Sequence, residues 1–240
     1  MNFIDEKVLI SLISVGLGWL LAQGTSLAKD LWGAQKLKRG LLHELEDIKE
    51  QLHRVVMLYA RQLQIYSLNG IEPSASIPIY NMFFKQYYKD VFSRLNREQR
   101  RSYQLIHASL DTLNKKNEDF AKFTGEIYKD LKDSKDDTAT QRAVGLWGDE
   151  VTVLYMTAKE VLWHVNYHLK NKRNPALDIM GPMHKSYLKF AEELRHEIKK
   201  IIEQGKNLNR EDFEKIYDEA IFKKSNSSHA APQPNRALNT

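Results

Sequence analysis

The N-terminal segment constrains the fold most, because it lacks charge over the length of a membrane-spanning helix. Positions 8–28 are 21 consecutive uncharged residues between Lys7 and Lys29. At 1.5 Å per residue, a helix of this length measures about 32 Å, close to the thickness of a bilayer's hydrocarbon core. Phe3 and Trp32 flank the segment, and aromatic rings favour the headgroup region. The pattern predicts a single transmembrane helix at residues 8–28.

Two other interpretations of this segment stay open. A cleaved signal peptide carries basic residues before its apolar part, whereas this chain has Asp5, Glu6 and Lys7 there; Ser26-Leu27-Ala28 nevertheless resembles a cleavage site. A buried helix of a water-soluble core would need protein cover on every side of residues 8–22. We favour an anchor that is not cleaved.

The flanking charges predict the orientation of the anchor. Only Lys7 precedes the span, whereas Lys29, Lys36, Lys38 and Arg39 follow it closely. Basic flanks stay on the cytoplasmic side of a membrane. We therefore expect a single-pass protein of the cell (inner) membrane, with residues 1–7 outside and residues 29–223 in the cytoplasm. The lipid bilayer is its first expected partner.

Small residues recur within the predicted span. Ser14, Gly18 and Ala22 are spaced by four residues, so they lie on one side of a helix. Small side chains at this spacing let two membrane helices approach closely. The spacing predicts self-association of the span, although small residues are also common in membrane helices generally.

A heptad pattern follows the span and is the clearest periodic signal in the chain. Its apolar positions alternate in steps of four and three, which keeps one stripe facing a partner helix. The stripe consists of Leu41, Leu45, Ile48, Leu52, Val55, Tyr59, Leu63 and Tyr66. It predicts a helix at about residues 34–68 that stops at Asn69-Gly70, before a loop.

Three further long patterns have the same rhythm, at about residues 97–132, 138–170 and 183–204. Asn96 and Gln99 form a capping box before the first of these. Asn117 and Thr124 occupy two of its apolar positions, where polar residues fix helix register. Gly205 follows the last pattern, at a position typical of a C-terminal cap.

These patterns predict an all-α protein in which four long helices form an elongated antiparallel bundle at residues 29–223. Six prolines and eleven glycines in 240 residues agree with long helices. A shorter helix is expected at about residues 210–222. Residues 224–240 have little to bury and are expected to be disordered.

An aromatic segment separates the first two long patterns. Residues 79–95 predict a short helix carrying six aromatic side chains, among them Tyr80, Phe84, Tyr87 and Tyr88. Aromatic residues at this density suit a binding surface, so these four are candidate contacts to a protein partner. The alternative is that the helix packs across its own bundle.

The charges give no support for a nucleic-acid partner. The net charge of +5 arises from 36 basic and 31 acidic residues that are mixed along the chain, whereas nucleic-acid binders gather basic residues on one face. The chain has no cysteine, which excludes disulfides and thiolate zinc sites. It has no glycine-rich phosphate loop, so we expect no cofactor.

One weak metal motif is present. Glu160, His164 and His168 are spaced by four residues, which places a carboxylate and two imidazoles on one side of a helix. The alternative is that these histidines pack near the end of a helix.

A second weak motif resembles the Arg-x4-6-His motif of the HEPN family of bundle-shaped ribonucleases. It consists of Arg101 and His107, and Ser102 takes the place of the Asn or Asp often found after this arginine. The resemblance implies that the two side chains act together at the scissile phosphate of RNA, in acid-base catalysis and charge stabilisation.

Three hypotheses for the function follow. The first is a non-enzymatic, membrane-anchored scaffold that holds a protein partner, or copies of itself, at the cytoplasmic face. The second is an oligomerising effector that permeabilises membranes through the ridge of Ser14, Gly18 and Ala22. The third is a ribonuclease that uses Arg101 and His107. The first agrees best with an anchor, a regular bundle and the lack of a catalytic motif.

Overall fold

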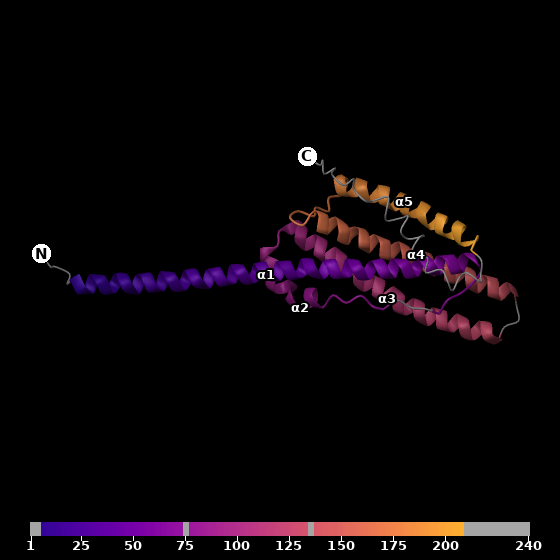
Figure 1. The fold of residues 1–240 in the computed structure, drawn as a ribbon, viewed down its shortest axis with the longest axis horizontal. Helices are drawn as coiled ribbons and strands as arrows, with labels where there is room; N and C mark the ends of the chain where they lie inside the picture. Colours follow the sequence, from indigo (N-terminus) through magenta and orange to yellow (C-terminus); the bar gives the residue numbers. More distant parts are fainter. Residues whose placement is uncertain (1–5, 74–76, 134–136, 209–240) are drawn as a thin grey trace, which may run out of the picture.

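One helix runs through most of the length of the molecule in the computed structural model (Figure 1). The structure describes residues 6–73, 77–133 and 137–208, and every regular element within these ranges is helical. The elements are α1 (Glu6–Ser67), α2 (Met82–Val91), the 3-10 helix η1 (Phe92–Arg94), α3 (Arg97–Asp133), α4 (Asp137–Lys170) and α5 (Pro182–Gly205). The predicted helix at 210–222 and the predicted tail at 224–240 lie outside the described residues.

The predicted span at 8–28 and the predicted helix at 34–68 form one helix rather than two. α1 has 62 residues and is about 93 Å long. No proline interrupts residues 6–67, and the uncharged segment continues directly into the heptads. α1 ends at Asn69-Gly70 as the sequence predicts: Asn69 adopts a left-handed conformation (φ 56°), and the Gly70 N–H donates to the Ile65 carbonyl at 3.0 Å. This pattern of bonds is a common helix terminus.

The heptad stripe of α1 faces the core. Seven of its eight predicted residues are buried, and only Tyr66 is half-buried. The stripe packs with apolar residues of α3, α4 and α5 in one continuous core. The periodicity therefore identified correctly which side of α1 the other helices cover.

The four long helices do not alternate in direction. α4 runs antiparallel to α1, because its early residue Gly148 lies against Tyr66 at the end of α1. It also runs antiparallel to α3, since His168 in its last turn lies 2.8 Å from Ser102 near the start of α3. α5 turns back along α4, where the Tyr155 hydroxyl bonds to Glu197. α1, α3 and α5 are therefore parallel to one another, with α4 antiparallel to all three.

This direction differs from the alternating antiparallel bundle that the sequence predicts. The reason is the long connection between α1 and α3, which we call the crossover (residues 71–73 and 77–95). It returns along α3: Tyr128 donates to the Ile71 carbonyl at 2.7 Å, and the Asn114 amide bonds to both backbone groups of Ile79. The crossover therefore carries the chain back along the bundle. As a result, α3 begins at the end of the bundle where the packed part of α1 also begins.

Two buried polar pairs lie at the polar positions predicted in the seam of α3. Tyr59 donates to Asn117 Oδ1 at 3.0 Å, and the Trp147 indole N–H donates to Thr124 Oγ1 at 3.1 Å. An unpaired polar group buried in a core is costly, so each pair favours one register of the helices.

Gly205 corrects one prediction. It is the last residue of α5, but no glycine in the described residues has a positive φ, and Lys206 continues with right-handed dihedral angles. Gly205 is buried instead against Ser67 and Gln64, where a side chain would collide with both. Close approach of α5 to α1 therefore explains this glycine, not a left-handed cap.

The predicted capping box at the start of α3 is confirmed and yields a prediction. Asn96 Oδ1 accepts from the Gln99 N–H at 2.8 Å, Gln99 Oε1 accepts from the Asn96 N–H at 3.0 Å, and Asn96 Nδ2 donates to the Arg173 carbonyl at 2.7 Å. We expect Asn96→Ala to lower the free energy of unfolding by about 1–2 kcal/mol, measured by urea titration in detergent with circular dichroism. Asn96→Asp keeps the capping acceptor, so it should lose less; equal losses would contradict the role of the cap.

Candidate functional site

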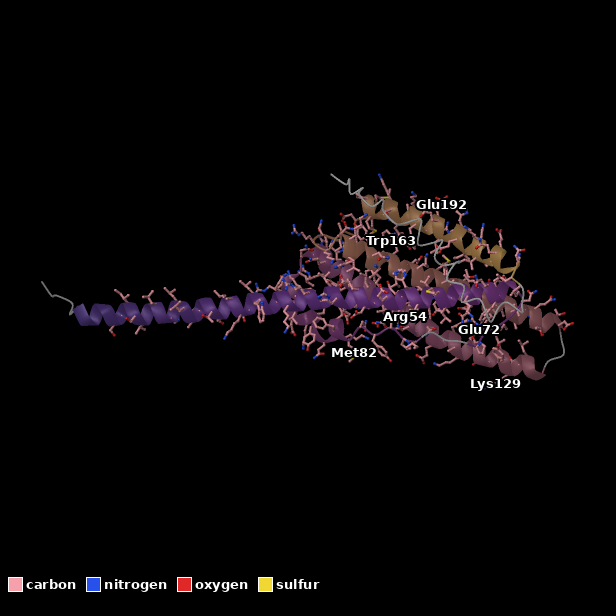
Figure 2. The ribbon with its side chains drawn as sticks, viewed as in Figure 1. Arg54, Glu72, Met82, Lys129, Trp163 and Glu192 are labelled. Atoms are coloured by element: carbon pink, nitrogen blue, oxygen red, sulfur yellow. The ribbon has the colours of Figure 1, made fainter. Side chains whose placement is uncertain are left out.

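The N-terminal part of α1 is an apolar surface without cover from the rest of the chain. All 22 residues from 11 to 32 are exposed, and Leu21 and Trp32 retain 72% and 73% of their surfaces. Figure 2 shows their side chains projecting on all sides of an isolated helix. In the described part of the chain, α1 is the one helix long and apolar enough to cross a bilayer. So large an apolar surface needs a covering medium or partner from outside this chain.

The predicted ridge of small residues lies within this surface. Ser14, Gly18 and Ala22 are all exposed, and a Cβ on Gly18 would meet nothing within 4 Å. The ridge is therefore accessible to a second helix. Its role in self-association stays a prediction.

A carboxylate from α1 caps the N-terminus of α2. Glu44 Oε1 accepts from the Phe83 N–H at 2.7 Å, and Oε2 accepts from the Phe84 N–H at 2.9 Å. These N–H groups have no partner within their own helix, and α2 has no acidic residue in its first turn. Burial raises the pKa of Glu44, while the two N–H bonds act in the opposite direction. Glu44 thus fixes the crossover to α1, a role that the heptad pattern does not reveal.

The two residues of the ribonuclease-like motif do not form one site. Arg101 is exposed and bonds to Glu98 at 3.3 Å. His107 is 2% exposed and stacks on the Phe84 ring, with centroids 3.7 Å apart. Its Nε2 lies 4.0 Å from Glu44, too far for a hydrogen bond, and burial lowers its pKa to about 3. A neutral, covered imidazole is a core side chain in this bundle, whereas Arg101 lies on its surface.

The two histidines of the predicted metal motif face different helices. His168 is buried and lies beside Ser102 and the Tyr103 ring, toward α3. His164 stacks on Tyr187 of α5, at a centroid distance of 5.5 Å. Burial lowers the pKa of each histidine to about 4. In the described ranges no three His, Asp or Glu side chains gather as a metal site, so the packing alternative describes these histidines better.

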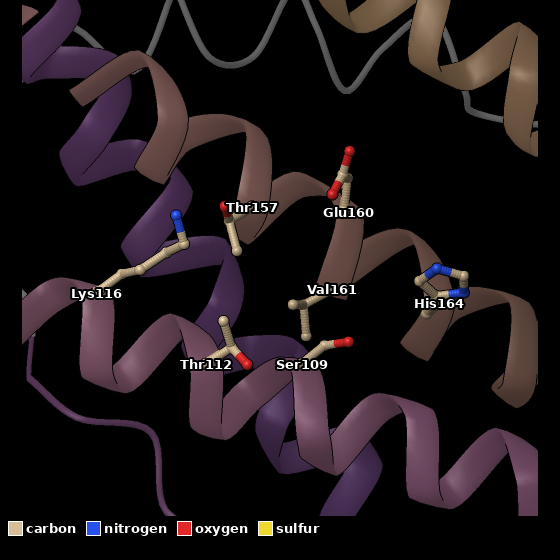
Figure 3. A pocket seen from close by; sticks show the side chains of 7 residues that line it. All are labelled: Ser109, Thr112, Lys116, Thr157, Glu160, Val161 and His164. Atoms are coloured by element: carbon tan, nitrogen blue, oxygen red, sulfur yellow. The ribbon is translucent and has the colours of Figure 1, made fainter. Parts of the chain in front are cut away.

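A shallow pocket of about 280 Å³ opens between α3 and α4 (Figure 3). Its lining consists of Ser109, Thr112, Lys116, Thr157, Glu160, Val161 and His164. The hydroxyls of Thr112 and Thr157 donate to carbonyls of their own helices, at 2.9 and 2.8 Å. These two hydroxyls are therefore engaged within their own helices rather than paired with a neighbouring base.

The aromatic residues of the crossover pack mostly against their own bundle. Phe84 and Tyr88 contact the core, and the Tyr88 hydroxyl donates to the Arg100 carbonyl at 3.2 Å. Tyr87 is half-buried beside Phe83, with ring centroids 4.7 Å apart. Tyr80 remains 64% exposed. Of the four candidate partner contacts, Tyr80 alone is fully available, and internal packing accounts for Phe84 and Tyr88.

Comparison with known proteins adds no further constraint, since no family model, curated protein or solved structure matches the chain.

Proposed function

We propose that this protein is a membrane-anchored helical scaffold that holds a protein partner, or further copies of itself, at the cytoplasmic face of a membrane. One observation carries the proposal. The exposed apolar part of α1 is continuous with the helix at the centre of the bundle. Lipid would cover this surface without any further contact from the chain. A helix without interruption would also transmit its fixed position in the membrane to the bundle.

The charges beside the exposed segment support the orientation. Lys29, Lys36, Lys38 and Arg39 lie between the end of the uncharged segment at Ala28 and the first buried residue, Leu41. On this proposal they remain on the cytoplasmic side and place the bundle there.

The packing of the histidines supports a non-enzymatic role. His107 and His168 are buried within the bundle, and His164 stacks on Tyr187 of α5 and meets the Trp163 ring of α4 edge-on. Their neutral imidazoles contribute to packing between helices. The surfaces available to a partner are then the outward sides of the helices and the exposed start of the crossover at Tyr80.

Charge placed in the span tests the anchor. The variant Leu17→Lys with Leu20→Lys puts two ammonium groups near the middle of the exposed segment, at a cost of about 3 kcal/mol each in a bilayer. We expect the full chain to stay in the membrane fraction after salt and carbonate washes, and the double variant to be lost from it. The control Leu17→Ile with Leu20→Ile should behave as the natural chain. Retention of the lysine variant, or release of the natural chain, would refute the anchor.

The interaction part of the proposal needs a separate measurement. Affinity capture of the full chain after crosslinking in cells should recover it with a partner or as an oligomer. Recovery of the monomer alone would count against a scaffold, even if the anchor is correct.

A further inference from the structure

The register of α1 and α3 sets how close the bundle comes to the end of the apolar segment. His107 of α3 lies beside Glu44 of α1, and the two helices are parallel. Arg97, ten residues before His107, is therefore about level with residue 34 of α1. Residue 34 is six residues, or about 9 Å, beyond Ala28, where the uncharged segment ends. The headgroup layer on each side of a bilayer is about 5–8 Å deep.

Three segments meet at this end of the bundle, which we call the basic end (residues 29–46, 89–101 and 170–181). In Figure 1 the start of α3 and the connection between α4 and α5 lie where the exposed part of α1 emerges. The connection is tied to α3, because Asn96 and Gln99 donate to the carbonyls of Arg173 and Lys172, at 2.7 and 2.8 Å.

The positive charge of the protein is concentrated at the basic end. Its three segments contain twelve Lys or Arg and six Asp or Glu, an excess of six positive charges, whereas the whole chain has an excess of five. One of the six acidic residues, Glu44, is buried beneath α2, and another, Glu46, pairs with Lys172 at 3.5 Å. Arg94, Arg97 and Arg173 are exposed. A surface of this charge attracts anionic lipid headgroups.

A tight turn at the basic end exposes two large apolar side chains. The Gly181 N–H donates to the Asp178 carbonyl at 3.1 Å, which places Ile179 and Met180 at the tip of the turn. Their side chains retain 83% and 75% of their surfaces. Met180 has a φ of 66°, a conformation that usually requires glycine or asparagine. Met180 therefore combines a strained backbone conformation with an exposed apolar side chain.

We propose that the basic end docks on the anionic headgroup layer of the membrane that α1 crosses, with Ile179 and Met180 inserted among the lipids. The inference rests on the proposed anchor, and it adds a second membrane contact and a lipid class. Basic side chains around an apolar tip match a layer of lipid phosphates above an apolar interior. The bundle then lies against the bilayer rather than being held away from it by α1.

Single thiols test this contact, because the natural chain has no cysteine. Leu20→Cys, Ile179→Cys and Leu146→Cys are each labelled with an environment-sensitive fluorophore in the full chain, reconstituted in vesicles of phosphatidylcholine with 30% phosphatidylserine. Lipids that carry a spin label near the headgroup quench fluorophores near the surface, and lipids that carry it deep in the acyl chain quench fluorophores near the bilayer centre. The deep label is read at position 20, the headgroup label at position 179, and both at position 146. Leu20 reports the anchor, Ile179 reports the turn, and Leu146, exposed near the far end of the bundle, is the matched control.

We expect quenching at positions 20 and 179, and none at 146. With Ile179 labelled, the added changes Lys170→Gln and Arg173→Gln, or vesicles without phosphatidylserine, should reduce the quenching at least twofold. Quenching at 20 with none at 179 would overturn the inference and leave the anchor intact. A blue shift at 179 without quenching would mean protein cover, such as a second copy, and would also overturn it. No quenching at 20 would refute the anchor and the inference together.

Discussion

Replacing Trp147 with alanine is expected to lower the free energy of unfolding of the bundle by about 4 kcal/mol. Trp147 is fully buried, and its indole N–H donates to Thr124 across the contact between α3 and α4. Truncating a large buried side chain removes its apolar contacts and leaves a cavity, which costs 3–5 kcal/mol for an aromatic residue. Urea titration in detergent, followed by circular dichroism at 222 nm, measures the change.

A second tryptophan supplies the control for this prediction. Trp32 lies on the same chain but is 73% exposed on the uncovered part of α1. Trp32→Ala should leave the unfolding of the bundle unchanged, within about 0.5 kcal/mol. If both variants lost the same stability, or if Trp147→Ala lost less than about 1 kcal/mol, the described core packing of α4 would be wrong.

Acidification from pH 6.5 to pH 5 is expected to destabilise the bundle by about 3 kcal/mol through its two most buried histidines. Burial lowers the pKa of His107 to about 3 and that of His168 to about 4, from an ordinary value of 6.5. Below pH 6.5 the unfolded chain therefore binds protons that the folded bundle does not, so stability falls as the pH falls. Each histidine contributes about 1.6 kcal/mol over this interval, because the unfolded imidazole is half protonated at pH 6.5 and almost fully protonated at pH 5.

Other groups modify the size of this effect. His164, with a pKa lowered to about 4, adds a contribution of the same sign. Glu44 acts in the opposite direction: its pKa is raised in the folded bundle, so it takes up a proton there first as the pH falls, which stabilises the fold. Burial also lowers the pKa of His53, so Glu44 opposes four histidines and the net effect of acid remains destabilising.

His107→Leu isolates one contribution to the pH dependence. In the described structure neither nitrogen of His107 has a hydrogen-bond partner, so the substitution removes a titratable group without breaking a bond. We expect the variant to lose about 2 kcal/mol less than the natural chain between pH 6.5 and pH 5. Identical pH dependence of unfolding in the two proteins would show that His107 is not buried as a neutral side chain.

Hydrophobic periodicity was sufficient to predict the long helices. α3 and α4 each differ from the predicted bounds by one residue at one end, and α5 differs by one residue at both ends. The stripe of α1 is buried along its length, and the capping box forms at Asn96. These features depend on residues within one or two turns of each other, so a single sequence contains the information that specifies them.

The candidate sites were harder to predict, because they depend on residues far apart in the chain. The spacing of Arg101 and His107 does not show that Phe84, from the crossover, covers the imidazole. The spacing of His164 and His168 does not show that one faces α5 and the other α3. The only signal for the role of Glu44 is an acidic residue next to Leu45 on the buried stripe.

The sequence alone determined the all-helical class, the uncharged segment, the apolar stripes and the helix ends, since local spacing and chain chemistry set these properties. Tertiary structure decided the rest. The path of the crossover made α3 parallel to α1 and brought the turn at Ile179 and Met180 to the end of the bundle beside the exposed helix. The course of a connection depends on the sum of many long-range contacts, and no local pattern of residues specifies that sum.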